Sequence, residues 1–182
     1  MKNIILNTKR LEIISGTLEH IRSEINNRVK FSALINAQIP DNWPPPLNDE
    51  QSQNYFLKYA EENPDTKGFS FWYIVLIEGN KRDLIGGIGF KGKPSEDGTI
   101  EIGYSIMETH HRNGYASEAV AALVNWAFSQ ENVFRVIAET FPDLIPSQKV
   151  LEKSGFRFIG EGSEPGIIRF ELKREDYSVK SD

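Results

Sequence analysis

The pattern of apolar positions is strand-like in the middle of the chain. Three β-rich runs follow one another there, with Gly79-Asn80 after the first and Pro94–Gly98 after the second. Short runs of this composition separated by turn residues are typical of neighbouring antiparallel strands. The sequence therefore predicts three such strands, over residues 69–77, 83–90 and 99–107.

Before these strands, the pattern indicates a strand followed by helices. Arg10–Ile14 alternates apolar and polar residues, and Thr17 can cap a helix from Leu18 to about Val29. A second helix is expected after Asp49, which is a good capping residue, and it should end before Pro64.

After Gly114 the period changes to that of a helix buried on one face. The apolar positions recur at three-and-four spacing, as Ala116, Ala119, Val120, Leu123, Val124 and Ala127. Val133–Thr140 is again strand-like, so a right-handed crossover is expected to join Ile100–Met107 and Val133–Thr140 as parallel strands.

The last part of the chain predicts a short helix and two more strands. The helix covers Ser147–Lys153 and can end at Gly155 in the left-handed conformation. The strands fit residues 156–160 and 167–172. We predict one mixed α/β (α+β) domain over residues 1–175, followed by a polar tail over residues 176–182.

Composition narrows the class of protein without naming a function. A chain of 182 residues is long enough to bury a core without covalent staples, and it contains no cysteine. Its net charge of −5 argues against nucleic acid as a partner and is compatible with a basic or amine-bearing one. Because no segment has the pattern of a signal peptide or membrane span, we expect no membrane association and a cytoplasmic location.

The clearest candidate for chemistry is T-H-H-R-N-G, which precedes the apolar helix. The first turn of a helix carries unpaired N–H groups and partial positive charge, and Gly114 allows an anion to approach them closely. Arg112 adds a positive charge suited to phosphate oxygens. From these residues alone, a plain loop is the more common outcome.

The spacing within this segment resembles the pyrophosphate loop of the GNAT family of N-acetyltransferases. That family has Gln/Arg-x-x-Gly-x-Gly/Ala, and His111, Arg112, Asn113, Gly114, Tyr115 and Ala116 occupy the six positions here. His111 stands where glutamine or arginine is usual.

A second segment, P-S-Q-K-V-L-E-K-S-G-F from Pro146 to Phe156, resembles another motif of the same family. The asparagine of that motif is replaced by Leu144. The resemblance extends from about Leu11 to Leu172, and E-I-G-Y in Glu101–Ile106 is similar to the branch that acetylates ribosomal-protein N-termini.

The resemblance implies a central, mostly antiparallel sheet of about seven strands with helices on both faces. Its fourth and fifth strands would be parallel and would splay apart to admit acetyl-coenzyme A. Backbone groups near Ile106 and Met107 would then bind the pantetheine, and residues 111–116 would hold the pyrophosphate.

Transfer of an acetyl group to an amine needs a base and a proton for the departing thiolate. Glu101 lies on the opposite strand face from its apolar neighbours and is the candidate base; a solvated or ion-paired glutamate is the alternative. Ser147 is the candidate proton donor or cofactor contact, with a helix cap as its alternative. Tyr104 and Tyr115 are further candidate donors, although packing is the more common use of tyrosine.

Two other patterns do not support a site. His110 and His111 lack a third ligand at metal spacing and His20 is isolated, so we expect no metal site. Gly87–Gly92 matches Gly-x-Gly-x-x-Gly but lies within a predicted strand, where a bulge or close packing explains it better than a dinucleotide. The Trp43–Pro46 loop either covers the core or forms a wall on the acceptor side.

The expected function is therefore direct acetyl transfer from acetyl-coenzyme A to a primary amine in a ternary complex. The acceptor is either a protein N-terminal amine or a small polyamine or amino sugar. A non-catalytic acyl-coenzyme A sensor or assembly module is the competing class, and an unrelated nucleotide at the same helix start is a third. The sequence does not exclude a homodimer.

Overall fold

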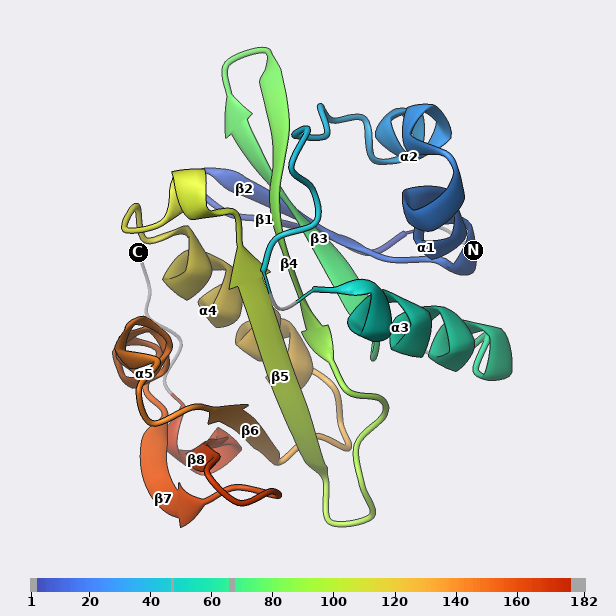
Figure 1. Cartoon of the computed structure of the whole chain (residues 1–182). Helices are drawn as coiled ribbons and strands as arrows, with labels where there is room; N and C mark the ends of the chain where they lie inside the picture. Colours follow the sequence, from blue (N-terminus) through green and yellow to red (C-terminus); the bar gives the residue numbers. More distant parts are fainter. Residues whose placement is uncertain (1–2, 47, 66–67, 178–182) are drawn as a thin grey trace.

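An eight-stranded, mostly antiparallel sheet forms the middle layer of the computed structural model, which describes residues 3–46, 48–65 and 68–177 (Figure 1). Its strands lie in the order β1-β2-β3-β4-β5-β6-β8-β7. The strands are β1 (Ile5–Asn7), β2 (Leu11–Ser15), β3 (Phe71–Glu78), β4 (Lys81–Phe90), β5 (Thr99–Ile106), β6 (Arg135–Thr140), β7 (Arg157–Glu161) and β8 (Ile168–Lys173). The helices are α1 (Leu18–Asn26), α2 (Arg28–Ile35), α3 (Glu50–Glu62), α4 (Tyr115–Phe128) and α5 (Ile145–Lys153), with short 3-10 turns at Glu108–His110 and Arg174–Asp176.

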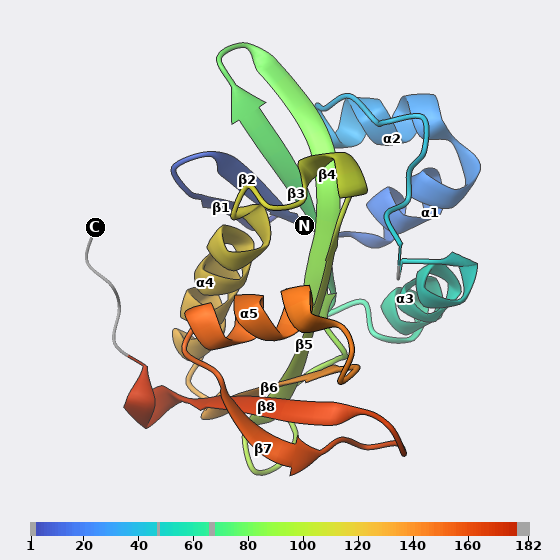
Figure 2. The same ribbon diagram turned by 60° about the vertical axis from the view of Figure 1, so that its left-hand side comes forward.

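Helices cover both faces of the sheet, as expected. Figure 2 shows α1, α2 and α3 on one face and α4 and α5 on the other. The predicted stripe of α4 is the buried one, and its members are Ala119, Val120, Leu123, Val124 and Ala127. Burying a valine or leucine contributes about 1.5–3 kcal/mol, so this stripe holds α4 firmly on the sheet.

The predicted parallel pair is confirmed as β5 and β6, which are joined through α4. The two strands pair only from Thr99↔Arg135 to Glu101↔Ile137. Beyond that point β5 continues to Ile106 and β6 to Thr140 without pairing to each other, and Figure 1 shows the two ribbons turning away from each other. The splayed pair is thus a feature of the structure.

Two glycines of β4 allow neighbouring atoms, of a side chain at Gly87 and of the backbone at Gly89, to lie close against the strand. A Cβ at Gly87 would be 2.2 Å from Cζ of Phe71, and one at Gly89 would be 2.5 Å from the carbonyl oxygen of Ser70. Close packing, as predicted, accounts for this Gly-x-Gly pattern inside a strand.

The amino-terminal part differs from the predicted elements at two places. The sheet, expected to have about seven strands, has eight, because Ile5–Asn7 forms an additional short edge strand paired antiparallel with β2. The single helix expected from Leu18 to Val29 is two helices. Asn27 leaves helical geometry at φ −153°, and its side chain accepts a hydrogen bond from the Lys30 N–H, so it ends α1 and caps α2.

The carboxyl-terminal elements match their predicted order. Gly155 has φ +92°, the left-handed conformation expected after α5. The helix begins at Ile145, two residues earlier than predicted. Of the predicted tail, Asp176 ends the second 3-10 turn, and the centroid of the Tyr177 ring lies 5.2 Å from that of Phe128. Residues 178–182 of the tail lie outside the described residues. Within the described ranges, no helix combines the length and apolar character that crossing a bilayer requires.

Candidate functional site

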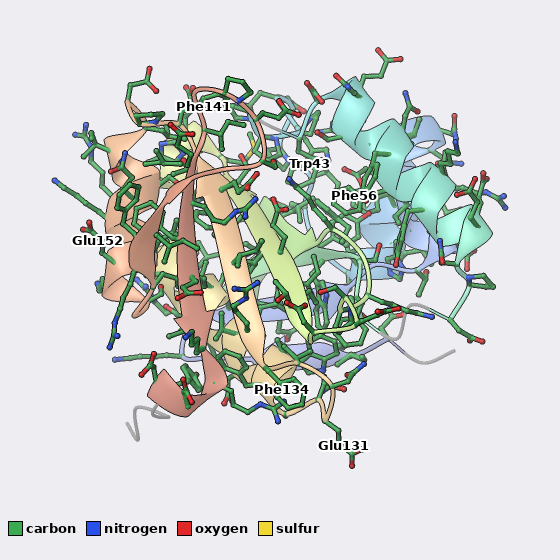
Figure 3. All side chains as sticks on the ribbon, turned by 90° about the horizontal axis from the view of Figure 1, so that it is seen from below. Trp43, Phe56, Glu131, Phe134, Phe141 and Glu152 are labelled. Carbon is green, nitrogen blue, oxygen red and sulfur yellow. The ribbon has the colours of Figure 1, made fainter. Side chains whose placement is uncertain are left out.

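A cleft of about 240 Å³ opens where β5 and β6 part. Strands β3, β4, β5 and β6, helices α3 and α5 and the residues next to them contribute its lining, which includes Phe56, Phe71, Lys91, Tyr104, Thr140 and Ser147. Figure 3 shows Phe56 and Trp43 on the α3 side of the sheet and Phe141 by the β6–α5 connection. The cleft therefore reaches both faces of the sheet around the free part of β5.

The backbone of β5 offers hydrogen-bonding groups to this gap. The Lys91 N–H donates to the Glu101 carbonyl oxygen at 3.0 Å, and the Met107 N–H donates to the Ile85 carbonyl oxygen at 2.8 Å, so Glu101 and Met107 direct these groups toward β4 and the residue that follows it. Because backbone groups alternate along a strand, those of Ile102, Tyr104 and Ile106 face the gap. Of the two residues expected to bind pantetheine, Met107 has both backbone groups bonded within the protein, since its carbonyl oxygen also accepts from the His110 N–H at 2.8 Å. Ile106 directs its N–H to the gap, while its carbonyl oxygen lies 2.8 Å from Nε2 of His111.

Beyond β5 the chain makes the predicted turn into α4. Arg112 has φ +63° and Gly114 has φ +81°, both in the left-handed region. No side chain of the described residues caps the amino end of α4. The N–H groups of its first turn are therefore available to an anion, as the loop sequence predicts.

The loop is fixed by contacts on several sides. The His111 Nε2 lies 2.8 Å from the Ile106 carbonyl oxygen, and the Asn113 side-chain amide donates to the His111 carbonyl at 3.1 Å. On the other side, Arg10 donates to the Asn113 carbonyl at 3.0 Å and forms an ion pair with Glu118 at 2.7 Å. Sequence reasoning missed Arg10 and Glu118, because no local pattern reveals a contact between residues so distant in the chain.

The two adjacent histidines make contacts within the loop and the strand before it. Nδ1 of His110 lies 3.0 Å from the Thr109 hydroxyl, and His111 is bound to Ile106 as described. In the part of the chain that the structure describes, no three metal-ligating side chains come together.

Ser147 faces the cleft from the first turn of α5. It does not cap the helix, because the helix starts at Ile145 and its N-cap position is Leu144. The Tyr104 hydroxyl lies 3.0 Å from the Ser147 carbonyl oxygen and 3.1 Å from its Oγ. Burial raises the pKa of Tyr104 to about 12, so its hydroxyl stays protonated and can donate at neutral pH.

Thr140, at the end of β6, is a further cleft residue that sequence reasoning missed. Its side chain is buried, and the described residues provide no hydrogen-bond partner for its hydroxyl. A buried hydroxyl without a partner is unfavourable by about 1–3 kcal/mol. A polar substrate in the cleft can remove this penalty.

Glu101 is the last residue of β5 that pairs with β6, and it is not among the described residues that line the cleft. Its carboxylate forms an ion pair with Lys91, whose side chain lines the cleft. Its apolar neighbours Ile100 and Ile102 are buried, so the expected division of strand faces is present.

On the face of the sheet covered by α3, the half-buried carboxylate of Glu24 on α1 binds three donors. It accepts hydrogen bonds from Trp43 Nε1 at 2.9 Å, Gln53 Nε2 at 3.0 Å and the Tyr73 hydroxyl at 2.7 Å. Burial raises the pKa of Glu24, and these donors oppose that change. Trp43 packs against the core on this face and is not among the lining residues of the cleft. At the other end of the same loop, the Pro46 carbonyl oxygen accepts a hydrogen bond from Ser105, which does line the cleft.

Comparison with known proteins identifies this arrangement. The family model described as an acetyltransferase (GNAT) domain matches residues 17–157. The chain is 43% identical over 102 residues to YjdG of Bacillus subtilis, which is called an uncharacterized N-acetyltransferase; the match covers 56% of this chain and 60% of that relative.

Two solved structures are similar in fold. The ribosomal-protein-S5-alanine acetyltransferase of Vibrio fischeri has a TM-score of 0.66 at 18% identity, covering 96% of this chain and 99% of the other. The ribosomal L7/L12 α-N-protein acetyltransferase RimL, solved in complex with coenzyme A, has a TM-score of 0.62 at 16% identity, covering 93% and 98%.

Proposed function

Because the chain belongs to the acetyltransferase (GNAT) family, we propose that it transfers the acetyl group of acetyl-coenzyme A to a primary amine by direct attack in a ternary complex. One observation carries the proposal: the cleft between β5 and β6 and the uncapped amino end of α4 both adjoin the carboxyl-terminal half of β5. An elongated molecule with a diphosphate can bind the helix end and reach the cleft with its thioester.

The described residues fit such a cofactor at three places. The loop from His111 to Ala116 offers N–H groups and Arg112 to phosphates. The gap-facing backbone at Tyr104 and Ile106 suits the amides of a pantetheine arm, and the unpartnered Thr140 hydroxyl adds a polar group beside it. Acetyl-coenzyme A supplies a thioester, whose carbonyl carbon bonds to the amine nitrogen while its carbon–sulfur bond breaks.

The protein's own side chains then move the protons. Glu101 accepts a proton from the amine, directly or through a water molecule. The Ser147 hydroxyl donates to the departing thiolate, and the serine regains a proton from solvent, to which Glu101 releases the proton that it took from the amine. Tyr104, held in its protonated form, keeps the Ser147 hydroxyl in place through the contact at 3.1 Å.

The charges lining the cleft favour a single amine over a polyamine. Among the described lining residues the one carboxylate is that of Glu139, which is paired with Arg169 at 2.6 Å, and the one cation, Lys91, is paired with Glu101. The α3 side instead carries Phe56 and Phe71, which suit an apolar side chain next to the amine. We propose the N-terminal amine of a protein as the acceptor, in line with what the names of the two structural neighbours state for them.

The test is thiol release from acetyl-coenzyme A with a panel of peptides that have free N-termini. The same peptides with blocked N-termini serve as controls, and a polyamine and an aminoglycoside represent the other acceptors. We expect turnover and a mass gain of one acetyl group only with free N-termini. Coenzyme A binding without turnover on any amine would instead indicate a non-catalytic acyl-coenzyme A-binding module.

A further inference from the structure

Arg10 lies between β1 and β2 and reaches the loop that precedes α4, 103 residues later in the chain. Its Nη1 donates to the Asn113 carbonyl at 3.0 Å, and its Nε donates to Oε2 of Glu118 at 2.8 Å. Its guanidinium also lies over the Tyr115 ring, 4.4 Å from the centroid. One side chain thus contacts residues on both sides of Gly114.

Glu118 is a charged group in the first turn of α4. Its Oε1 accepts from the Thr8 hydroxyl at 2.6 Å and from the Arg10 N–H at 2.9 Å, while Oε2 pairs with Nη2 of Arg10 at 2.7 Å. Burial on its own would raise the pKa of Glu118, but the hydrogen bonds from Thr8 and Arg10 hold the pKa below its ordinary value. The group is a carboxylate at neutral pH.

A carboxylate at this position opposes the binding of another anion at the same helix end. The partial positive charge of a helix amino end is only about half an elementary charge, so an uncompensated carboxylate in the first turn would outweigh it. Arg10 supplies the compensating charge at ion-pair distance. Without Arg10, the negative charge of Glu118 would repel a diphosphate at this helix end.

Arg10 also fixes the direction of a peptide group. The carbonyl of residue 113 and the N–H of residue 114 belong to one planar, trans peptide and point in opposite directions. Because Arg10 binds the Asn113 carbonyl, the Gly114 N–H points away from the contact, and the described residues provide no acceptor for it. This N–H is left to face the anion.

We propose that Arg10 is a positioning residue for the cofactor's diphosphate, because it neutralises Glu118 and orients the Asn113–Gly114 peptide. This inference rests on the proposed function. If Arg10 only stabilised the fold, its loss would weaken the binding of every ligand. In the proposed role, its loss weakens the binding of phosphate-bearing ligands in particular.

The experiment measures coenzyme A affinity by titration calorimetry for the wild-type protein, Arg10→Gln, Glu118→Gln and the double variant. We expect Arg10→Gln to weaken binding about tenfold, the size of a partly buried charge effect at a helix end. The double variant should regain part of the loss, because the uncompensated carboxylate is gone while the Asn113 carbonyl still lacks its donor. Arg157→Gln, on β7, is the matched surface control and should bind as the wild type does.

Two further readouts separate positioning from stability. Binding of pantetheine, which lacks phosphates, should be equal for Arg10→Gln and the wild type when followed by ligand-observed NMR. Thermal unfolding shows that each variant is folded at the assay temperature. A double variant as weak as Arg10→Gln overturns the neutralisation of Glu118. An Arg10→Gln affinity within about twofold of the wild type overturns both roles of Arg10. A wild-type protein that does not bind coenzyme A overturns the proposed function as well.

Discussion

The hydroxyl of Tyr104 on β5 lies 3.1 Å from the hydroxyl of Ser147 on α5, across the gap left by the divergence of β5 and β6. The same tyrosine hydroxyl donates to the Ser147 carbonyl oxygen at 3.0 Å. The contact joins β5 and α5, which both contribute residues to the lining of the cleft. It places a protonated group next to the residue proposed to donate to the thiolate.

Tyr104→Phe should lower turnover about tenfold, equivalent to about 1.4 kcal/mol, because the Ser147 hydroxyl loses the partner that orients it. Coenzyme A affinity should change little, since the phosphate loop is untouched. Steady-state kinetics together with calorimetry separate these effects. Tyr177→Phe, at the ring contact with Phe128, is the control, and wild-type turnover in Tyr104→Phe would remove the orienting role.

Glu101→Gln should lower turnover by about a hundredfold while coenzyme A affinity stays nearly intact, as expected for loss of a general base. Lys91→Met is the informative control, because it breaks the same ion pair but leaves the carboxylate in place. Equal effects of the two substitutions on turnover would mean that Glu101 acts only through its salt bridge.

Gly114→Ala should weaken coenzyme A binding. The added Cβ has room, with Nη2 of Arg10 as its nearest neighbour at 3.5 Å, but φ +81° is strained for alanine by about 1 kcal/mol and the loop is expected to shift. Gly79→Ala is matched to it: Gly79 has φ +60° in the β3–β4 turn, far from the loop, so it should lose similar stability and bind normally. Normal affinity in Gly114→Ala would count against the phosphate loop.

Glu12→Gln should reduce the free energy of unfolding by about 1 kcal/mol at neutral pH, because Arg82 binds both carboxylate oxygens, at 2.8 and 2.6 Å. The Arg82 hydrogen bonds hold the pKa of Glu12 below its ordinary value of 4.5, against the opposing effect of burial. The pKa of Glu12 is lower in the folded protein than in the unfolded chain. The stabilisation by the Glu12–Arg82 pair is therefore fully present above pH 4.5 and is lost as the pH falls through the folded-state pKa.

Urea unfolding at several pH values measures this difference between Glu12→Gln and the wild type. The two proteins should converge in acid. Glu19→Gln, which breaks an exposed ion pair with Lys30, should differ little from the wild type at any pH. A difference in the free energy of unfolding between Glu12→Gln and the wild type that grows as the pH falls would contradict a stabilising ion pair of Glu12 with Arg82.

Local patterns determined much of this protein. The apolar stripe of α4, the alternation in β2, the caps at Thr17 and Asp49, and the left-handed glycines depend on neighbouring residues, so they are readable from the chain itself. The parallel β5–β6 pair followed from the helix between two strands, because a crossover of that kind returns the chain in the same direction.

Only the tertiary structure decided which distant groups meet. The contacts of Arg10 with Glu118 and of Tyr104 with Ser147 join residues 108 and 43 positions apart, and no local rule selects those partners. The same holds for β8, which lies between β6 and β7. Such contacts depend on how the packed elements bring side chains together, and a helical or strand period in the sequence specifies only which face of an element is buried.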